Sequence, residues 1–215
     1  MRKLEALIIG VDLGQSHDYT AISTLEKYQD YFEWPYEGER DGKPVYHCRF
    51  LERPALGTPY PAVVRRTAEV YQNLIKHFEK KPVLVIDSTG VGNPIFDMFK
   101  EIDLNPVGIS IHGGNKVSRG DGRHYNVPKR DIIGFLQSIN QSDHLMVSPS
   151  LALRDVFIHE LLNMRVKVNI NTGHDSYEAW REGDHDDLVL SVGCGAWWGK
   201  YLDRQFSTMP KPLGL

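Results

Sequence analysis

The sequence predicts an α/β fold with a mixed central β-sheet and helices on both faces. Residues 6–51 contain three strand-like segments separated by polar turns. Residues 61–111 then alternate between amphipathic helical patterns and short apolar runs. A meander of strands followed by alternating helices and strands is typical of a mixed sheet that helices cover on both sides.

The N-terminal segment predicts an antiparallel hairpin and a third strand. Residues 6–12 form a short apolar run with β-branched side chains, which ends before Gly14. Residues 20–25 are apolar enough to pair with this first strand. Residues 26–44 are polar and aromatic, so we interpret them as an insertion or a long hairpin tip, and residues 46–51 as the third strand.

The middle of the chain predicts two helices, each followed by a strand. A strongly amphipathic helix begins at Pro61, a residue tolerated in the first helical turn, and ends before Pro82. Residues 83–87 are all apolar up to the final aspartate, which favours a central strand covered on both faces. A short helix over 94–101 and a strand over 107–111 follow.

The last third of the chain predicts mainly helices. Residues 127–141 and 150–164 have helical patterns, and residues 166–170 form a short strand between elements. A final helix is predicted from about residue 184 to residue 205, with its apolar side chains near helical spacing.

Length and composition favour one domain over residues 1–208, with a disordered tail over 209–215. A chain of 215 residues can bury a sizeable core. Its two cysteines, Cys48 and Cys194, are far apart and do not form a metal-ligand motif, so a disulfide framework or structural zinc site is not expected. Because no signal peptide or membrane-spanning run is evident, we expect a soluble, cytoplasmic protein without membrane partners.

Two predicted strands end in an aspartate, Asp12 and Asp87. Loops at the carboxyl ends of such strands open a crevice where sites gather. A carboxylate delivered there by an apolar strand is costly unless a positive charge compensates it, and Mg²⁺ and Mn²⁺ prefer such hard oxygen ligands. Taken alone, each aspartate is better explained as the cap of a turn or helix.

A third acidic segment changes this balance. Residues 183–187 read Gly-Asp-His-Asp-Asp and directly precede an apolar helix. Helical spacing places Asp184, Asp187 and Ser191 on one face. The helix dipole accounts for some negative charge at this position, but it does not readily explain three acids together. Two-ion phosphodiester cleavage requires several carboxylates from separate segments, which Asp12, Asp87 and this cluster supply.

A local excess of positive charge lies within residues 112–131, although the net charge of −3 gives no global indication of nucleic-acid binding. A solvated polar loop is the ordinary interpretation of such a run. The alternative is a nucleic-acid contact formed by five residues: Lys116, Arg119, Arg123, Lys129 and Arg130.

Four segments together resemble the RNase H-like nuclease superfamily. More narrowly, they resemble the nuclease domain of the large subunit of tailed-phage terminases, which package and cut viral DNA. The resemblance spans residues 10–198. It is carried by GVDLGQSHDYTA at 10–21, VIDSTGVG at 85–92, VPK at 127–129 and GDHDDLV at 183–189.

The resemblance implies a metal-dependent endonuclease that cleaves double-stranded DNA with little sequence specificity. It implies two Mg²⁺ or Mn²⁺ ions held by Asp12, Asp87 and Asp187, with Asp12 bridging them. Asp184 resembles an auxiliary metal ligand. His185 and Asp186 would each either contribute a ligand or orient one, and Lys129 matches a family lysine that would contact phosphate.

Full terminase subunits also contain a packaging ATPase, but no G-x-x-x-x-G-K-[ST] phosphate loop occurs in this sequence. We therefore expect an excised domain or a stand-alone relative. Its partners would be DNA, a packaging ATPase domain, and other terminase and portal components. If the chain is phage-encoded, it would act in the cytoplasm of the host bacterium.

Three other interpretations remain open. A Holliday-junction resolvase shares the fold and the ion chemistry but differs in substrate shape. An actin/Hsp70-like ATPase would use residues 11–16 and 87–92 as phosphate loops, but it would need a second domain and would leave the 184–187 acids unused. A non-catalytic DNA-binding module would retain an acidic pocket that repels phosphates.

Overall fold

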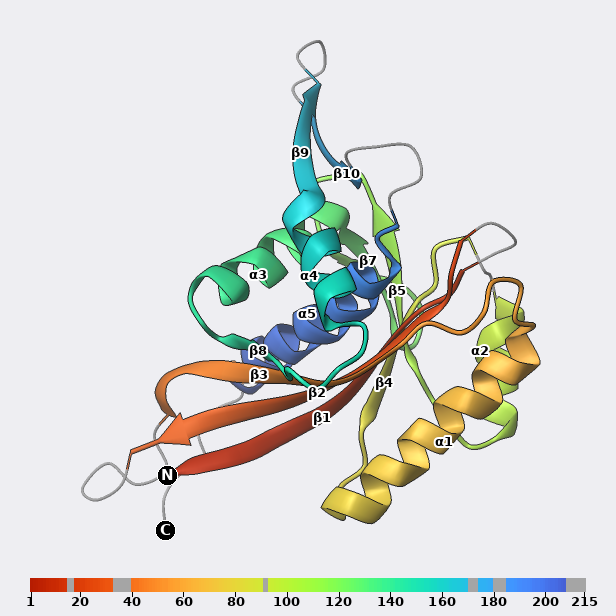
Figure 1. Ribbon diagram of the computed structural model, residues 1–215, viewed down its shortest axis with the longest axis horizontal. Coiled ribbons are helices and arrows are strands. Elements are labelled where there is room, and N and C mark those ends of the chain that lie inside the picture. Colours follow the sequence, from red (N-terminus) through yellow and green to blue (C-terminus); the bar gives the residue numbers. More distant parts are fainter. Residues whose placement is uncertain (15–17, 33–39, 91–92, 170–173, 180–184, 208–215) are drawn as a thin grey trace.

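The computed structural model describes residues 1–14, 18–32, 40–90, 93–169, 174–179 and 185–207 (Figure 1). The main-sheet strands are β1 (Arg2–Asp12), β2 (Ala21–Tyr31), β3 (Arg40–Glu52), β4 (Val83–Asp87), β5 (Val107–His112), β6 (Ser118–Arg119), β7 (His124–Pro128) and β8 (Leu145–Val147). The second sheet contains β9 (Met164–Asn169) and β10 (His174–Ala179). The helices are α1 (Tyr60–Phe78), α2 (Asn93–Glu101), α3 (Lys129–Gln141), α4 (Arg154–Asn163) and α5 (Asp187–Ser207).

The main sheet is mixed, with the strand order β6-β7-β5-β4-β1-β2-β3-β8. Strands β1, β2 and β3 form an antiparallel meander, while β4, β5 and β7 continue the sheet from β1 in parallel. This confirms the predicted fold class and the predicted order of elements up to β5. Strands β1 and β4 are central, so their carboxyl ends meet in the middle of the sheet edge.

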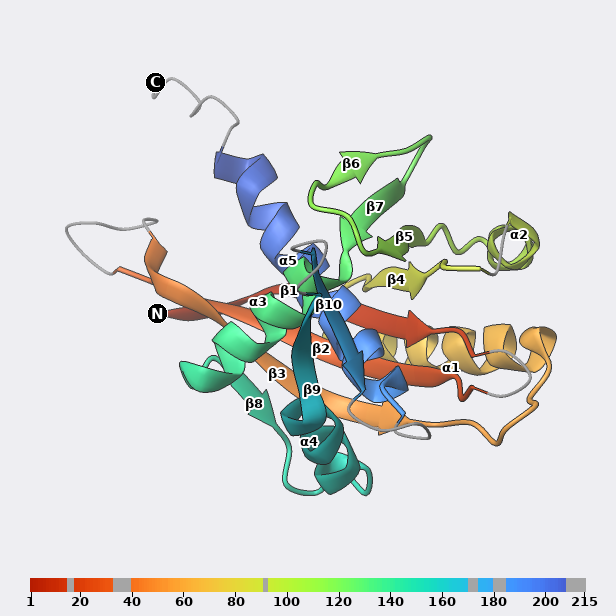
Figure 2. The same cartoon turned by 90° about the horizontal axis from the view of Figure 1, so that it is seen from above.

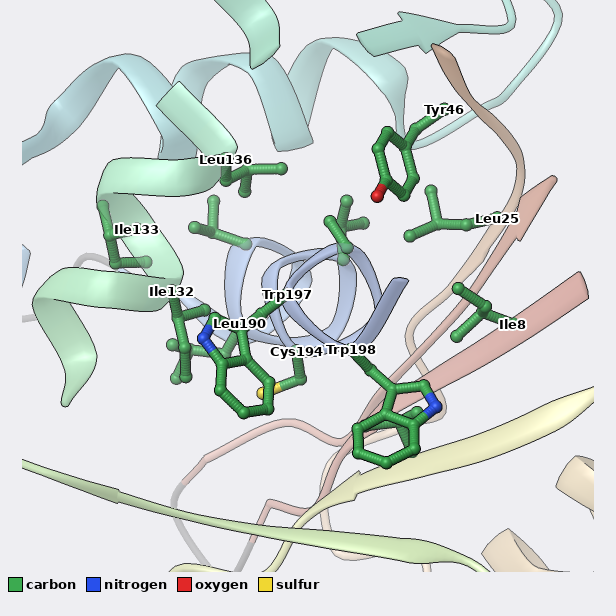
Figure 3. Packing of buried hydrophobic residues seen from close by; sticks show 14 of the residues in the cluster. Ile8, Leu25, Tyr46, Ile132, Ile133, Leu136, Leu190, Cys194, Trp197 and Trp198 are labelled. Atoms are coloured by element: carbon green, nitrogen blue, oxygen red, sulfur yellow. The ribbon is translucent and has the colours of Figure 1, made fainter. Parts of the chain in front are cut away.

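Helices cover the sheet on both faces (Figures 1 and 2). Helices α1 and α2 lie on one face, and α3, α4 and α5 lie on the other. Side chains along β1 alternate between the two resulting cores, because successive residues of a strand point to opposite faces. Ile9 and Val11 pack with α1 and α2. Ile8 packs with α3 and α5, in the core that Figure 3 shows around Trp197.

Small residues bring α5 unusually close to β1 and β2. A side chain on Gly10 would place its Cβ 2.0 Å from the carbonyl oxygen of Ser191, so only glycine fits between strand and helix. One turn further along α5, a Cβ on Gly195 would approach Leu25 to 3.1 Å. The Ser191 hydroxyl donates to the Gly10 carbonyl at 2.9 Å and lies 2.8 Å from the Ser23 hydroxyl. These contacts fix the start of α5 beside the end of β1.

Several predicted boundaries were wrong. Residues 26–31 continue β2, and Glu26, Lys27 and Gln29 are buried within it. Residues 127 and 128 end strand β7, so α3 begins at Lys129.

Other differences concern the edge strands and the last helix. Strands β6, β7, β8 and β10 were not predicted. Helix α5 begins at Asp187, three residues later than expected. Among the described helices, none combines the length and apolar character of a membrane span.

Candidate active site at the carboxyl ends of β1 and β4

Asp12 and Asp87 end two neighbouring parallel strands. The register pairs Ile8 with Val83 and Val11 with Ile86, so the next residues along each strand are the two aspartates. The apolar runs that predicted buried strands therefore deliver two carboxylates to the same edge of the sheet.

Asp187 lies on the same side of the sheet end because close packing and a hydrogen bond hold the start of α5 against β1. It is the first residue of α5, and Ser191 lies one turn later on the same helix face. The hydrogen bond from Ser191 to the Gly10 carbonyl anchors this turn two residues before Asp12. The structure thus brings together the three aspartates of the predicted ligand set that it describes, while Asp184 lies outside the described residues.

Asp12 is the electrostatic centre of this group. Withdrawal from bulk water raises the pKa of its carboxyl well above the usual value, and the negative charges of Asp87, Asp187 and Asp186 raise that pKa further. Lys129 is the positive group that opposes this rise. None of the hydrogen bonds among the described residues stabilises the Asp12 carboxylate, so its charge is largely uncompensated.

Asp87 is partly explained as a turn residue. Its Oδ1 accepts hydrogen bonds from the Thr89 backbone N–H at 2.8 Å and from the Thr89 hydroxyl at 2.5 Å. Burial nevertheless raises the pKa of Asp87, against the opposing effect of these hydrogen bonds. The turn therefore fixes one carboxylate oxygen of Asp87, and a role in the acidic group remains compatible with it.

Asp187 is a buried carboxylate at the start of α5. Burial raises the pKa of its carboxyl to about 6, although the nearby guanidinium of Arg53 opposes the rise. Arg53 Nη2 lies 3.2 Å from Asp187 Oδ2. Within the described part of the chain, that oxygen accepts no hydrogen bond. A buried carboxylate oxygen with no hydrogen bond is costly unless something else occupies it.

Glu160 on α4 is a further buried acid, which the sequence interpretation did not include in the candidate site. Its Oε1 accepts a hydrogen bond from Arg53, and its Oε2 accepts one from the Val189 backbone N–H at 3.4 Å. Burial raises the pKa of Glu160 to about 7, with Arg53 opposing. Its position three residues after the buried Phe157 was the available signal, because that spacing places Glu160 on the apolar face of α4.

Asp186 and Lys129 form a pair beside the three aspartates. Lys129 Nζ lies 2.7 Å from Asp186 Oδ2. The Asp186 carbonyl accepts the Leu190 N–H at 2.9 Å and so begins the hydrogen bonding of α5, while its side chain turns to Lys129. His185 Nδ1 lies 3.9 Å from Asp187 Oδ2, and its ring packs edge-on against Tyr19. His185 therefore lies near Asp187, and Asp186 pairs with Lys129.

The other four residues predicted to contact nucleic acid form no ion pair with these aspartates among the described contacts. Lys116 is exposed. Arg119 donates to the Gly122 carbonyl, Arg123 donates to the Asn105 carbonyl, and Arg130 donates to the Asn115 carbonyl. Of the five residues proposed to contact nucleic acid, Lys129 is the one that the structure places among the acids.

The donor set fits a hard divalent cation, although the described residues do not form a ready coordination shell. No three acidic, histidine or cysteine side chains in the described ranges lie close enough together to hold an ion as they stand. All the candidate ligands offer carboxylate oxygens, which Mg²⁺ and Mn²⁺ prefer. The Asp187 oxygen that accepts no hydrogen bond from the described residues and the raised pKa of Asp12 both indicate a shortage of positive charge. The described group contains two cationic side chains, Lys129 and Arg53, and five carboxylates: Asp12, Asp87, Glu160, Asp186 and Asp187.

Comparison with known proteins finds similarity in structure alone. No protein-family model matches the sequence, and no curated protein matches it. The large terminase nuclease of thermophilic phage G20c is similar to this chain with a TM-score of 0.59 at 20% identity, over 88% of this chain and 80% of that one. The human cytomegalovirus terminase nuclease domain gives 0.51 at 13% identity, over 92% and 83%. The same domain soaked with Mn gives 0.50 at 13% identity, over 94% and 85%. The chain therefore has the RNase H-like fold of terminase nuclease domains.

Proposed function

We propose that this chain is a divalent-metal-dependent endonuclease that cleaves double-stranded DNA with little sequence specificity. The observation that carries the proposal is the meeting of Asp12, Asp87 and Asp187 from three separate segments at one edge of a terminase-nuclease fold. Three carboxylates with too little compensating charge are the arrangement that phosphodiester cleavage by bound cations requires.

In this proposal Asp12, Asp87 and Asp187 hold two Mg²⁺ or Mn²⁺ ions. The Mn-soaked state of the similar cytomegalovirus domain supports divalent-cation use. Bound cations of this type lower the pKa of a water nucleophile and stabilise negative charge on the leaving oxygen. The hydrogen bonds of Thr89 to Asp87 and of Ser191 to Gly10 orient two of the three ligand positions.

The chain's own positive groups have separate tasks. Lys129 faces the acidic group and would contact the phosphate next to the cleaved bond. Arg119, Arg123 and Arg130, together with Lys116, would hold the DNA backbone further away. Contacts of this kind recognise phosphates and carry no base information, so cleavage would depend little on sequence.

The proposed biological setting is genome packaging by a viral terminase. The structural similarity to terminase nucleases supports this setting, in which the chain supplies DNA cutting. A packaging ATPase in another domain or another chain would supply translocation.

The test is cleavage of supercoiled plasmid by purified protein with EDTA, Mg²⁺ or Mn²⁺. We expect nicking and linearisation that require the cation and disappear in Asp187→Asn. Asp97→Asn is the matched control, because Asp97 is exposed on α2 and pairs with Lys100. An absence of cleavage in every metal, or full activity of Asp187→Asn, would overturn the proposal.

A further inference from the structure

Arg53 connects three elements beside the acidic group. It directly follows β3, and its guanidinium reaches Glu160 on α4 and Asp187 at the start of α5. The guanidinium also lies over the Tyr19 ring, 5.1 Å from its centroid. All three charged side chains of this set are largely withdrawn from solvent.

The two acids do not share Arg53 equally. Glu160 accepts a hydrogen bond from Arg53 Nη2, and its second oxygen is occupied by the Val189 N–H. The contact of the same nitrogen with Asp187 Oδ2 is an ion pair at 3.2 Å, and within the described residues this oxygen accepts no hydrogen bond. Glu160 therefore holds the arginine, and Asp187 keeps a lone pair for another partner.

We propose that Glu160 and Arg53 are positioning residues that set how tightly Asp187 and its neighbours bind a divalent cation. Glu160 restrains the guanidinium, so that Arg53 does not form a hydrogen-bonded ion pair with Asp187 and does not compete with the divalent cation for this carboxylate. This inference rests on the proposed metal-dependent function, and it adds two residues outside the ligand set: Arg53, which contacts Asp187, and Glu160, which acts through Arg53.

The proposal requires opposite effects from the two partners. Replacing Arg53 by Gln removes a positive charge next to Asp187, so the acidic group should bind a divalent cation more tightly. Replacing Glu160 by Gln releases Arg53, which then pairs fully with Asp187 and weakens cation binding. If the pair were only structural, loss of either partner would loosen the site and weaken binding in both variants.

The experiment is calorimetric titration of Mn²⁺ into metal-free protein at pH 8, which does not depend on cleavage. We expect the dissociation constant to fall by about fivefold or more in Arg53→Gln and to rise by about fivefold or more in Glu160→Gln. In the double variant most of the weakening caused by Glu160→Gln should disappear, because Glu160 acts through Arg53. Arg66→Gln is the matched control, since Arg66 pairs with Glu52 at 2.8 Å and does not contact the acidic group.

Circular dichroism and thermal unfolding establish that each variant is folded. If Arg53→Gln does not fold, Arg53→Lys retains the charge and should bind Mn²⁺ within about threefold of wild type, while Glu160→Gln still weakens binding. Weaker binding in both Arg53 variants, or unchanged binding in Glu160→Gln, would overturn the inference. A wild-type protein that binds no Mn²⁺ would instead overturn the proposed function itself.

Discussion

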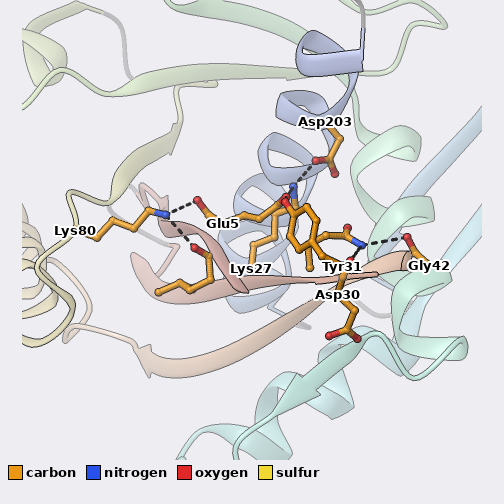
Figure 4. A network of polar contacts seen from close by, with 9 residues as sticks. Glu5, Lys27, Asp30, Tyr31, Gly42, Lys80 and Asp203 are labelled. Carbon is orange, nitrogen blue, oxygen red and sulfur yellow. Dashed lines mark hydrogen bonds and ion pairs between the residues drawn. The ribbon is translucent and has the colours of Figure 1, made fainter. Parts of the chain in front are cut away.

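The two ends of the β1–α5 pair differ in how their buried charged side chains are paired. At one end, Lys27 on β2 lies 2.9 Å from Glu5 on β1 and 2.5 Å from Asp203 on α5 (Figure 4). The Lys27 side chain is only 2% exposed, and the Tyr31 hydroxyl donates to Glu5 at 2.5 Å. At the other end of the same strand and helix, the Asp12 side chain has no ion pair or hydrogen bond among the described residues, and Asp187 shares Arg53 with Glu160.

This difference separates a network that stabilises the fold from the proposed metal site. In the Lys27 network each of the two acids contacts the buried lysine directly, and these ion pairs connect the last turns of α5 to the sheet. Charges around Asp12 repel one another, so the folded chain retains them at a cost to its stability. Uncompensated buried charge is a mark of sites that bind something else, such as a cation.

The largest expected effect is on cleavage, at the uncompensated end. Asp12→Asn should lower plasmid cleavage at least about a thousandfold, equivalent to ~4 kcal/mol of transition-state stabilisation. The same substitution should leave the free energy of unfolding equal or higher, because it removes one charge from a repelling group. Cleavage assays and urea unfolding of the metal-free protein measure the two effects. A clearly destabilised Asp12→Asn variant would show that Asp12 has a structural role like that of Lys27.

The next largest effect should occur at the compensated end, and on stability alone. Lys27→Met leaves Glu5 and Asp203 without their shared cation, which should lower the free energy of unfolding by about 3 kcal/mol. Cleavage per folded molecule should be unchanged. Lys100→Met is the control, since Lys100 forms an exposed pair with Asp97 and should change stability by less than about 0.5 kcal/mol. Equal effects of the two lysine substitutions would contradict the structural role of the network.

A dependence of stability on pH should follow from the acidic end. The pKa of Asp187 is raised to about 6 and that of Glu160 to about 7, both above their unfolded values. A carboxyl with a raised folded pKa contributes stability that is present below its unfolded pKa and lost as pH rises through its folded pKa. In EDTA, the free energy of unfolding measured with urea should therefore be higher at pH 5 than at pH 8, by about 2 kcal/mol. A flat profile over this range would mean that these carboxyls titrate near their ordinary values.

The sequence was sufficient for the features that depend on local pattern. Apolar runs ending in Asp12 and Asp87 predicted two buried strands, and the structure pairs these strands in parallel at the centre of the sheet. Acidic residues directly before an apolar helix predicted the start of α5 to within three residues.

Features that depend on distant partners could not be predicted in this way. Lys27 lies 176 residues from Asp203 in the chain, so the burial of a polar segment of β2 has no local signal. The pairing of Arg53 with Glu160, 107 residues later, is also invisible to helical spacing alone. Whether a polar residue is solvated or buried was decided by which charge the fold places opposite it.

The smallest expected effect directly tests the shortage of positive charge. Mn²⁺ at about tenfold excess over its dissociation constant should raise the free energy of unfolding by ~1.4 kcal/mol at pH 8, because only the folded chain assembles the ligands. Lys27→Met should retain this increment, since its network is at the opposite end of β1 and α5. Asp12→Asn should lose it, because the central carboxylate is gone. At pH 5 the increment should shrink in the wild type, because protons compete with the cation for the same oxygens. An equal increment in all three proteins would mean that Mn²⁺ binds outside the acidic group, and the charge imbalance around Asp12 would then need another explanation.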